Sequence, residues 1–304
     1  MIHLYESCRI CPRNCGVNRL KGETGFCNEP AQLRIGAAVI HKGEEPPLVG
    51  EGGSGTIFIS GCNLGCSFCQ NFQVSQEGFG KPITSQEFAG VCAALRDKGA
   101  ENINIVTGSH AVPGIIEGLI AAREAGITLP VLWNSSGYDS IEALELLQNY
   151  VDIFLPDIKT LDSILAQKFF NAPDYPKIVK AAVLKMIEIT KKTKSRIIIR
   201  HLILPGYLES TRSVLRWFAD NVKDHALMSL MTQYTPVTRN DKTKLMPNRF
   251  VSADEYETVL NWLDEFNIED GFCQELVTGS AWLPDFNRPN PFSSELSVPV
   301  FKLF

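Results

Sequence analysis

The 304-residue sequence contains no apolar run of about eighteen residues, the length that a membrane-spanning helix needs. Residues 1–7 hold neither a basic stretch nor an apolar one, so we expect no signal peptide. Basic residues are outnumbered: 29 Lys and Arg face 34 Asp and Glu, for a formal net charge of −5. That balance argues against broad nucleic-acid binding through phosphate contacts. We therefore expect a globular protein whose partners include neither a membrane nor a nucleic acid.

Cysteine, in contrast, is plentiful. Seven of the nine cysteines stand in two short groups, and the other two, Cys92 and Cys273, are predicted to be small hydrophobic side chains. Many cysteines can mark a secreted protein held by disulfides, but tight groups with ligand-like spacing favour metal binding in a reducing compartment. The sequence therefore predicts a cytoplasmic metal-binding protein.

One group lies on a glycine-rich loop after the apolar run 56–59. Cys62, Cys66 and Cys69 form a C-x3-C-x2-C pattern there. Soft thiolate ligands favour an iron–sulfur cluster, zinc or Cu(I). Three cysteines leave one iron of a four-iron cluster without a protein ligand, as catalytic metal sites do. A zinc site would need a fourth ligand nearby, and the nearest histidine in the sequence is His41.

The other group lies at the N-terminus, where Cys8, Cys11, Cys15 and Cys27 follow the spacing C-x2-C-x3-C-x11-C. Four thiolates complete the ligand set of a zinc ion or of a second [4Fe-4S] cluster, and the spacing does not separate the two. A complete set indicates a structural or electron-relay role. Two disulfides are the alternative, and a reducing compartment disfavours them.

From residue 56 onwards, apolar runs alternate with stretches of helical periodicity. Six strand–helix units predict an α/β fold with a parallel sheet, too short to close and therefore a partial (β/α)6, TIM-like barrel. We expect a cysteine-rich metal-binding segment and linker at residues 1–50, and the barrel with a C-terminal extension at residues 51–304. The expected strands are 56–60, 102–107, 131–134, 152–156, 196–204 and 227–234, and the expected helices are 85–98, 112–125, 140–150, 176–192, 210–221 and 253–266.

Polar residues follow these strands at their carboxyl ends, where parallel barrels carry their catalytic groups. Asp157 and Lys159 would share one side, as an internal ion pair or as two ligands for a zwitterion. Arg200 lies in an apolar run, so it either pairs with Asp157 or binds a carboxylate. His110 either faces the substrate or caps its turn. The other candidates at these ends are Thr107, Ser109, Asn134, Ser136 and His201.

The loop from Cys62 to Cys69 resembles that of the radical SAM superfamily, with Phe68 in the aromatic position before the last cysteine. The resemblance implies that Cys62, Cys66 and Cys69 are the catalytic ligands of a [4Fe-4S] cluster whose open iron binds S-adenosylmethionine. It also implies the reaction. The reduced cluster passes one electron to the sulfonium, a C–S bond breaks, and the resulting 5′-deoxyadenosyl radical removes a hydrogen atom from a substrate.

Three strand ends are similar to those of the pyruvate formate-lyase activating enzyme group: Asp157-Ile-Lys159, the run from Arg200 to Gly206, and the turn from Asn134 to Gly137. Residues 107–109 replace the Gly-Gly-Glu-Pro that is usual in the superfamily. The N-terminal cysteines resemble an uncharacterised branch of this group. The cofactor-binding residues that the resemblance implies are Phe68, Thr107, Ser109, Asn134, Ser136, Asp157, Lys159, Arg200 and His201.

The same resemblance implies the partners. The hydrogen atom would come from a glycine of a glycyl radical enzyme or from another protein or peptide, and a flavodoxin or ferredoxin-type protein would donate electrons. The alternative is a radical SAM enzyme that acts on a small molecule or a peptide without any glycyl radical. The absence of Gly-Gly-Glu, and of a cysteine-rich insert just after the main loop, fits this alternative. A third interpretation is a non-enzymatic scaffold with two zinc sites.

Overall fold

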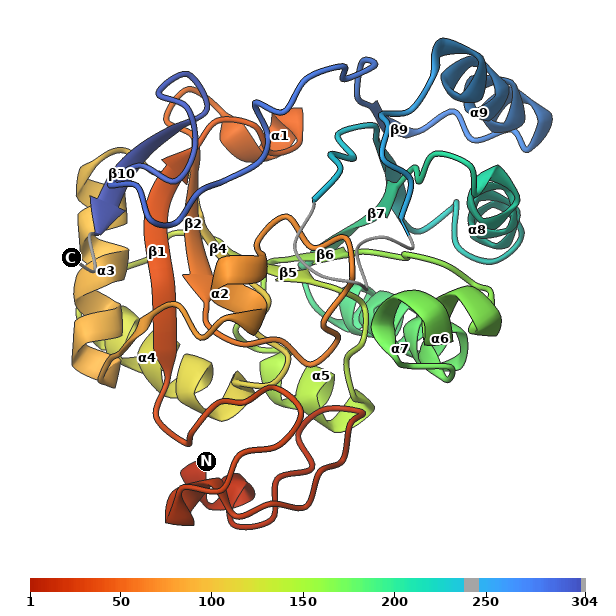
Figure 1. Ribbon diagram of the computed structural model, residues 1–304. Coiled ribbons are helices and arrows are strands. Elements are labelled where there is room, and N and C mark those ends of the chain that lie inside the picture. The colour runs from red at the N-terminus through yellow and green to blue at the C-terminus, as the bar shows by residue number, and fades with distance from the viewer. Residues whose placement is uncertain (238–245, 302–304) are drawn as a thin grey trace.

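One long sheet with helices along its outside makes up most of the computed structural model, which describes residues 1–237 and 246–301 (Figure 1). The strand order is β10-β1-β2-β4-β5-β6-β7-β8-β9, and β3 pairs with β1. All pairings from β2 to β9 are parallel, whereas β10, β2 and β3 each pair antiparallel with β1. Among the described residues the sheet does not close, because β10 and β9, at its two ends, each pair with a strand on one side only. The predicted α/β partial barrel is therefore confirmed.

The six strands expected from the sequence all occur in the expected order, as β2, β4, β5, β6, β7 and β8. The strands are β1 (Arg34–His41), β2 (Ser54–Ile59), β3 (Lys81–Pro82), β4 (Ile103–Val106), β5 (Val131–Ser135), β6 (Ile153–Pro156), β7 (Arg196–Leu202), β8 (Leu227–Met231), β9 (Gly271–Cys273) and β10 (Ser297–Phe301).

The helices begin and end close to the expected positions. The sequence missed α1, α2 and α6. It placed the start of α3 correctly at Ser85, after the capping residue Thr84, whereas α8 begins at Leu208 and not at Ser210. The helices are α1 (Pro46–Val49), α2 (Phe72–Gln76), α3 (Ser85–Asp97), α4 (Val112–Glu124), α5 (Ile141–Leu147), α6 (Ser163–Phe170), α7 (Tyr175–Lys192), α8 (Leu208–Asn221) and α9 (Ala253–Glu265), with short 3-10 turns at Ile2–Tyr5 and Arg19–Lys21.

Burial on both faces explains why the parallel strands read as continuous apolar runs. Every residue of β2, β4 and β5 is buried, as expected for a sheet covered by helices on one side and filled by side chains on the other. Trp133 and Phe154 are fully buried in the centre of this core. Most of the buried apolar side chains form one large core cluster, and two smaller clusters accompany it. This packing fixes the positions of the strand ends.

Three strands depart from the expectation. The sequence analysis assigned residues 1–50 to a segment and linker outside the barrel, but β1 is a buried strand inside the sheet, between β2 and β10. The sheet thus extends across residue 50, and the division into two domains stays a prediction. β10 lies in the C-terminal extension, where no strand was expected. β9 adds a seventh parallel strand and carries Cys273, which was predicted to be a small hydrophobic side chain but is exposed; Cys92, predicted in the same way, is buried.

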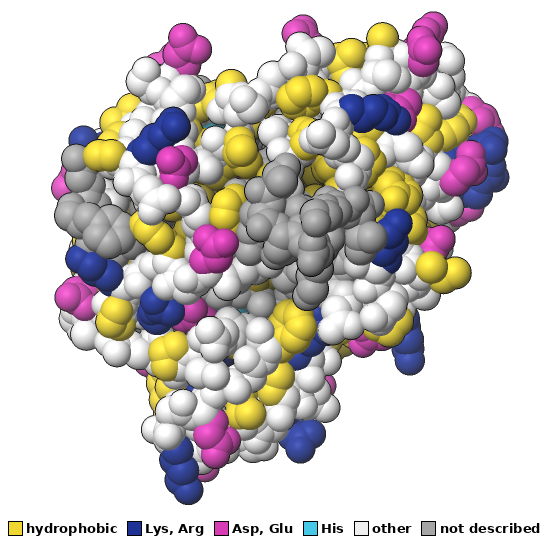
Figure 2. Space-filling model, viewed as in Figure 1, with side chains coloured by type: hydrophobic (Ala, Val, Ile, Leu, Met, Phe, Trp, Pro, Cys, Tyr) yellow, Lys and Arg dark blue, Asp and Glu magenta, His cyan; other side chains and the backbone are white. Residues whose placement is uncertain are grey.

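The surface supports two further statements. No helix in the described ranges is both long and apolar enough to cross a membrane. On the face that Figure 2 shows, acidic and basic side chains are intermixed, so no broad patch of one charge covers that face. The N-terminal segment lies below the strands in Figure 1, close to α4 and α5.

Candidate functional site

The cysteine loop leaves β2 through a sharp turn. Gly61 has a φ of +78°, and a Cβ there would lie 2.3 Å from Glu29 Cγ and 2.9 Å from the Cys27 carbonyl oxygen. Only glycine accepts both the left-handed backbone and this close approach. The loop is then held at its far end, where the Gln76 side-chain amide donates to the Cys66 carbonyl at 3.0 Å. The turn directs the loop across the carboxyl ends of the parallel strands.

The three thiols of this loop line one cavity of about 210 Å³. The backbone N–H of Leu64 donates to Cys62 Sγ at 3.3 Å, and Cys69 Sγ lies 3.2 Å from the Ser75 hydroxyl. Burial raises the pKa of the Cys66 thiol, and the nearby Lys159 ammonium opposes that shift. All nine cysteines of the chain, each within the described residues, are free thiols. The thiols are therefore available as ligands.

The arrangement fits a cluster better than a single ion. Among the described residues, no three His, Cys, Asp or Glu side chains are gathered closely enough to hold one metal ion. A [4Fe-4S] cluster takes each thiolate on a different iron, so its ligands stand farther apart than those of a zinc ion. Three free thiols around one cavity, with polar strand ends opposite them, suit such a cluster with an open iron.

Phe68, the aromatic residue of the loop, is buried and lines the same cavity. Its ring meets Phe169 and Phe170 of α6 edge-on, with centroids 6.0 Å apart in each case. The backbone N–H of Ser67 donates to the Phe169 carbonyl at 2.9 Å. Phe68 thus fixes the last turn of the loop against α6, a helix that the sequence did not predict.

The ends of β4 and β5 bring further predicted residues to the cavity. Thr107, Asn134 and Ser136 line it, as does Ser135, which the sequence analysis did not single out. Thr107 has a φ of +65°, which strains a β-branched residue, and its N–H donates to the Asn134 carbonyl at 3.0 Å. The residue thus holds an unfavourable backbone where the superfamily usually places Gly-Gly-Glu-Pro.

The charged residues after β6 and on β7 pair with one another in the cavity wall. Asp157 accepts from Lys159 Nζ at 2.6 Å and from Arg200 Nε at 2.9 Å. Burial alone would raise the pKa of Asp157, but Arg200 and Lys159 together hold that pKa below its usual value. Burial likewise opposes the charge of Lys159, yet Asp157 leaves the Lys159 pKa raised. The predicted alternative of an internal ion pair is therefore what the structure contains.

Arg200 has additional partners that tie separate elements together. Its Nη2 donates to Asn134 Oδ1 on β5, and its Nη1 lies 3.5 Å from Glu44 Oε2. Glu44 in turn accepts from the Asn104 side-chain amide at 3.0 Å. The guanidinium therefore contacts β5, the residue after β6 and the segment that follows β1.

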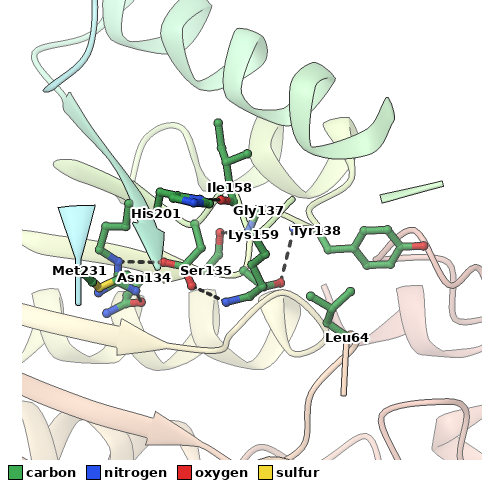
Figure 3. Close-up of polar contacts among 12 residues, drawn as sticks. Leu64, Asn134, Ser135, Gly137, Tyr138, Ile158, Lys159, His201 and Met231 are labelled. Carbon is green, nitrogen blue, oxygen red and sulfur yellow. Dashed lines mark hydrogen bonds and ion pairs between the residues drawn. The ribbon is translucent and has the colours of Figure 1, made fainter. Parts of the chain in front are cut away.

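Three candidates do not reach the cavity. Adjacent residues on a strand face opposite sides, so His201 cannot accompany Arg200: its ring binds the Ile158 carbonyl and the Thr211 hydroxyl, as its position beside Ile158 in Figure 3 shows. The assignment of His201 to the cofactor site is corrected on this ground. Ser109 is buried beside Asp139 instead. His110 binds the Ser60 carbonyl at 2.7 Å and has no place in the cavity lining.

The sequence analysis missed one wall of the cavity. His41 and Glu44 reach it from the end of β1 and the turn after it, and Trp282 and Phe292 reach it from the C-terminal segment. In the sequence Glu44 is a polar residue shortly before two prolines, and no pattern there predicts that it follows a strand. His41 is buried, and its Nδ1 has no partner among the described residues. Burial lowers the pKa of His41 to about 4, so its ring is neutral.

Glu45, next to Glu44, is the second unexpected acid. Its Oε1 accepts from the Ser229 hydroxyl at 3.0 Å, and its Oε2 has no partner in the described part of the chain. Burial raises the pKa of Glu45 to about 7, although Arg200 acts in the opposite direction. This carboxyl group therefore changes charge close to neutral pH.

Comparison with known proteins agrees with the site. The family model for the radical SAM superfamily matches residues 56–218. An uncharacterised protein of Methanocaldococcus jannaschii is 30% identical over 276 residues, which cover 88% of this chain and 77% of that protein. A second uncharacterised protein of the same organism is 26% identical over 233 residues, covering 68% of this chain and 63% of that protein.

Two solved structures share the fold. A radical SAM methyltransferase from Sphaerobacter thermophilus has a TM-score of 0.53 at 15% identity, over 73% of this chain and 66% of that chain. Methylornithine synthase has a TM-score of 0.52 at 14% identity, over 76% of this chain and 75% of that chain. At these identities the likeness shows the architecture alone.

Replacing Asp157 with Asn should leave Lys159 without its anion and Arg200 with Glu44 as its remaining anion. We expect Asp157→Asn to lower the free energy of unfolding by about 3–5 kcal/mol, measured by urea denaturation, because breaking a buried pair strands its partners. The control Glu145→Gln removes the half-exposed carboxylate that pairs with Lys185, and it should change stability little. Equal effects of the two changes would contradict a buried ion-pair network.

Glu45 should make stability depend on pH. Its pKa is raised on folding, so the folded chain binds more protons than the unfolded chain between about pH 4.5 and about pH 7, and stability falls as pH rises through this window. Glu45→Gln should reduce that fall in unfolding free energies measured at the two ends of the window. The exposed control Glu124→Gln should retain it. An unchanged fall in Glu45→Gln would refute the assignment.

Proposed function

The chain belongs to the radical SAM superfamily, and on that premise we propose that it uses a [4Fe-4S] cluster and S-adenosylmethionine to remove a hydrogen atom from a substrate. One observation carries the proposal: the thiols of Cys62, Cys66 and Cys69 line the same cavity as the polar ends of β4, β5, β6 and β7. Ligands for the cluster and groups suited to a charged cofactor thus face one space.

Each part of the chain has a role in this proposal. When bound, the reduced cluster supplies the electron that cleaves S-adenosylmethionine into methionine and a 5′-deoxyadenosyl radical, the hydrogen-abstracting species. The three thiolates hold the cluster. Thr107, Asn134 and Ser136 offer hydroxyl and amide groups for the cofactor's ribose and carboxylate.

The charged side chains Asp157, Lys159 and Arg200 would orient the cofactor while they remain paired with one another. Lys159 and Arg200 present positive charge to the cavity while Asp157 keeps them in place. Because each is less than one fifth exposed, their field acts in a setting where water screens it weakly. The carboxylate of the cofactor would therefore lie beside Lys159. The ammonium group of the cofactor would lie beside hydrogen-bond acceptors on the opposite wall of the cavity.

The substrate we favour is a small molecule or a compact part of a peptide. Phe58, Phe292 and Trp282 form an aromatic wall of the same cavity, which favours a compact and partly apolar group beside the cofactor. Apolar side chains there would also keep water away from a radical. The placement of His41 and Glu44 in this wall offers one neutral ring and one carboxylate for polar recognition.

Activation of a glycyl radical enzyme is the second candidate. The Asp157-Ile-Lys159 run and Arg200 favour it, because they lie at the cavity as the resemblance to activating enzymes requires. In either case a flavodoxin or ferredoxin-type protein would supply electrons.

We further propose that Cys8, Cys11, Cys15 and Cys27 hold zinc or a second cluster, and that the protein works in the cytoplasm, where thiols stay reduced.

Cys66→Ala should remove the catalytic cluster's contribution to the iron–sulfur absorbance near about 400 nm, because that cluster loses a ligand. It should also abolish the formation of 5′-deoxyadenosine in anaerobic incubations with S-adenosylmethionine and dithionite. Any absorbance of an N-terminal cluster should remain. Cys273→Ala is the matched control, since that thiol is exposed and away from the cavity, and it should keep both signals. Full catalytic-cluster content and turnover in Cys66→Ala would sink the proposal.

A glycyl radical test separates the two substrate classes. If the chain is an activating enzyme, anaerobic reaction with a glycyl radical enzyme of the same organism should give a protein-bound glycyl radical in the electron paramagnetic resonance spectrum. For the substrate class we favour, the same mixture should cleave S-adenosylmethionine without that signal. A strong glycyl signal would overturn our preference for a small substrate.

A further inference from the structure

The four N-terminal cysteines come together in the structure although the segment has little regular secondary structure. Their thiols line a single small cavity that Arg13, Arg19 and His110 also line. The Phe26 N–H donates to Cys15 Sγ at 3.4 Å, and a Cβ on Gly25 would lie 2.6 Å from that sulfur. A thiolate site is stabilised by hydrogen-bond donors directed at the sulfur and by a backbone that approaches the sulfur closely. As they stand among the described residues, the four thiols do not form a group that could hold a single ion.

His110 supplies an independent sign of a ligand. Its ring is 1% exposed, and its Nε2 binds the Ser60 carbonyl at 2.7 Å. Because a carbonyl only accepts, Nε2 carries the proton and Nδ1 is left with a bare lone pair. That Nδ1 has no partner among residues 1–237 and 246–301, and the ring lines the four-cysteine cavity. A buried acceptor without a partner is costly unless something in the cavity satisfies it.

Arg13, between Cys11 and Cys15, joins this segment to the catalytic loop. Its guanidinium donates to the carbonyls of Asn63 at 2.7 Å and Leu64 at 3.3 Å, both between Cys62 and Cys66. It also donates to the carbonyl of Phe170, the last residue of α6, at 2.9 Å and to that of the next residue, Asn171, at 2.7 Å. Charged donors in a rigid fork make strong, directional hydrogen bonds. The planar group lies over the Phe26 ring, 3.6 Å from its centroid, so it is fixed on the N-terminal side as well.

A second connection runs through the start of the catalytic loop. Arg19 is 3% exposed, and it donates to the His110 carbonyl at 2.7 Å while approaching Cys8 Sγ to 3.9 Å. The His110 ring holds the Ser60 carbonyl, directly before Gly61, and the Cys27 carbonyl lies against Gly61. The N-terminal segment therefore contacts the catalytic loop on both sides of Cys62.

We propose that the four cysteines hold a thiophilic metal centre, with His110 beside it, and that this centre braces the catalytic cluster loop through Arg13 and the His110–Ser60 contact. The inference rests on the proposed function, because it needs a catalytic cluster to brace. Zinc and a second iron–sulfur cluster share the required chemistry. A segment with only two short 3-10 turns gains its order from such a centre, since metal binding supplies folding free energy.

The first experiment establishes the centre without the catalytic cluster. The triple variant Cys62→Ala, Cys66→Ala, Cys69→Ala of the full chain, purified anaerobically, is analysed for iron, sulfide and zinc. We expect about one zinc, or about four irons with about four sulfides, per chain. Loss of all metal from this variant overturns the inference, while the iron content of the unaltered chain reports separately on the proposed function.

The second experiment tests the brace. Arg13→Gln should keep the N-terminal metal, which shows that the segment still folds, yet release its catalytic iron to a chelator about ten-fold or more faster, as loss of a supporting partner does. The electron paramagnetic resonance spectrum of the reduced cluster with S-adenosylmethionine should change as well. Arg13→Lys keeps the charge without the fork and should restore this only in part.

Arg9→Gln is the matched control for the brace. Arg9 lies in the same segment and is exposed, and its guanidinium bonds only to Asn14 among the described contacts. It should behave as the unaltered chain in both iron release and spectrum. If Arg13→Gln and Arg9→Gln behave alike while the unaltered chain carries both centres, the brace is refuted and the proposed function stands.

Discussion

A single buried carboxylate organises the cavity wall. Asp157 neutralises Lys159 from two residues away and Arg200 from the neighbouring strand, and none of the three would be stable alone at such depth. Because Arg200 also reaches Asn134 and Glu44, the carboxylate indirectly fixes β5, β7 and the turn after β1 relative to one another. The positive charge that faces the cluster loop is thus a rigid part of the wall, and it is present before any cofactor arrives.

The parallel part of the fold could be predicted because its signals are local. Continuous apolar runs such as that of β5 mark strands buried on both faces, and glycine and capping residues mark the helices between them. The cysteine loop and the polar strand ends could be predicted for the same reason. Their spacing along the chain places Asp157, Lys159 and Arg200 at one edge of the sheet, whatever the details of packing.

The remaining parts depend on contacts between distant segments. β1 looks like an isolated apolar run, and only its antiparallel pairing with β2 makes it part of the sheet and brings His41 and Glu44 to the cavity. The prediction that His201 lies at the cofactor site was wrong for a simpler reason. Adjacent residues on a strand face opposite sides, so Arg200 and His201 cannot both face the cavity. The carbonyls that receive Arg13 are invisible in a sequence, because every residue has one.

The strand order has a consequence for the open side of the barrel. Its two end strands, β9 and β10, are consecutive in the chain, and residues 274–296 connect them. In the described part of the chain the two end strands are not joined by hydrogen bonds, but the chain itself connects them across the open side of the barrel. This connection brings Trp282 and Phe292 to the cavity. Both ends of the connection are anchored in the sheet, so its reach is bounded. A covalent connection of fixed length thus spans the open side of this barrel, where a closed barrel would have an eighth strand and helix.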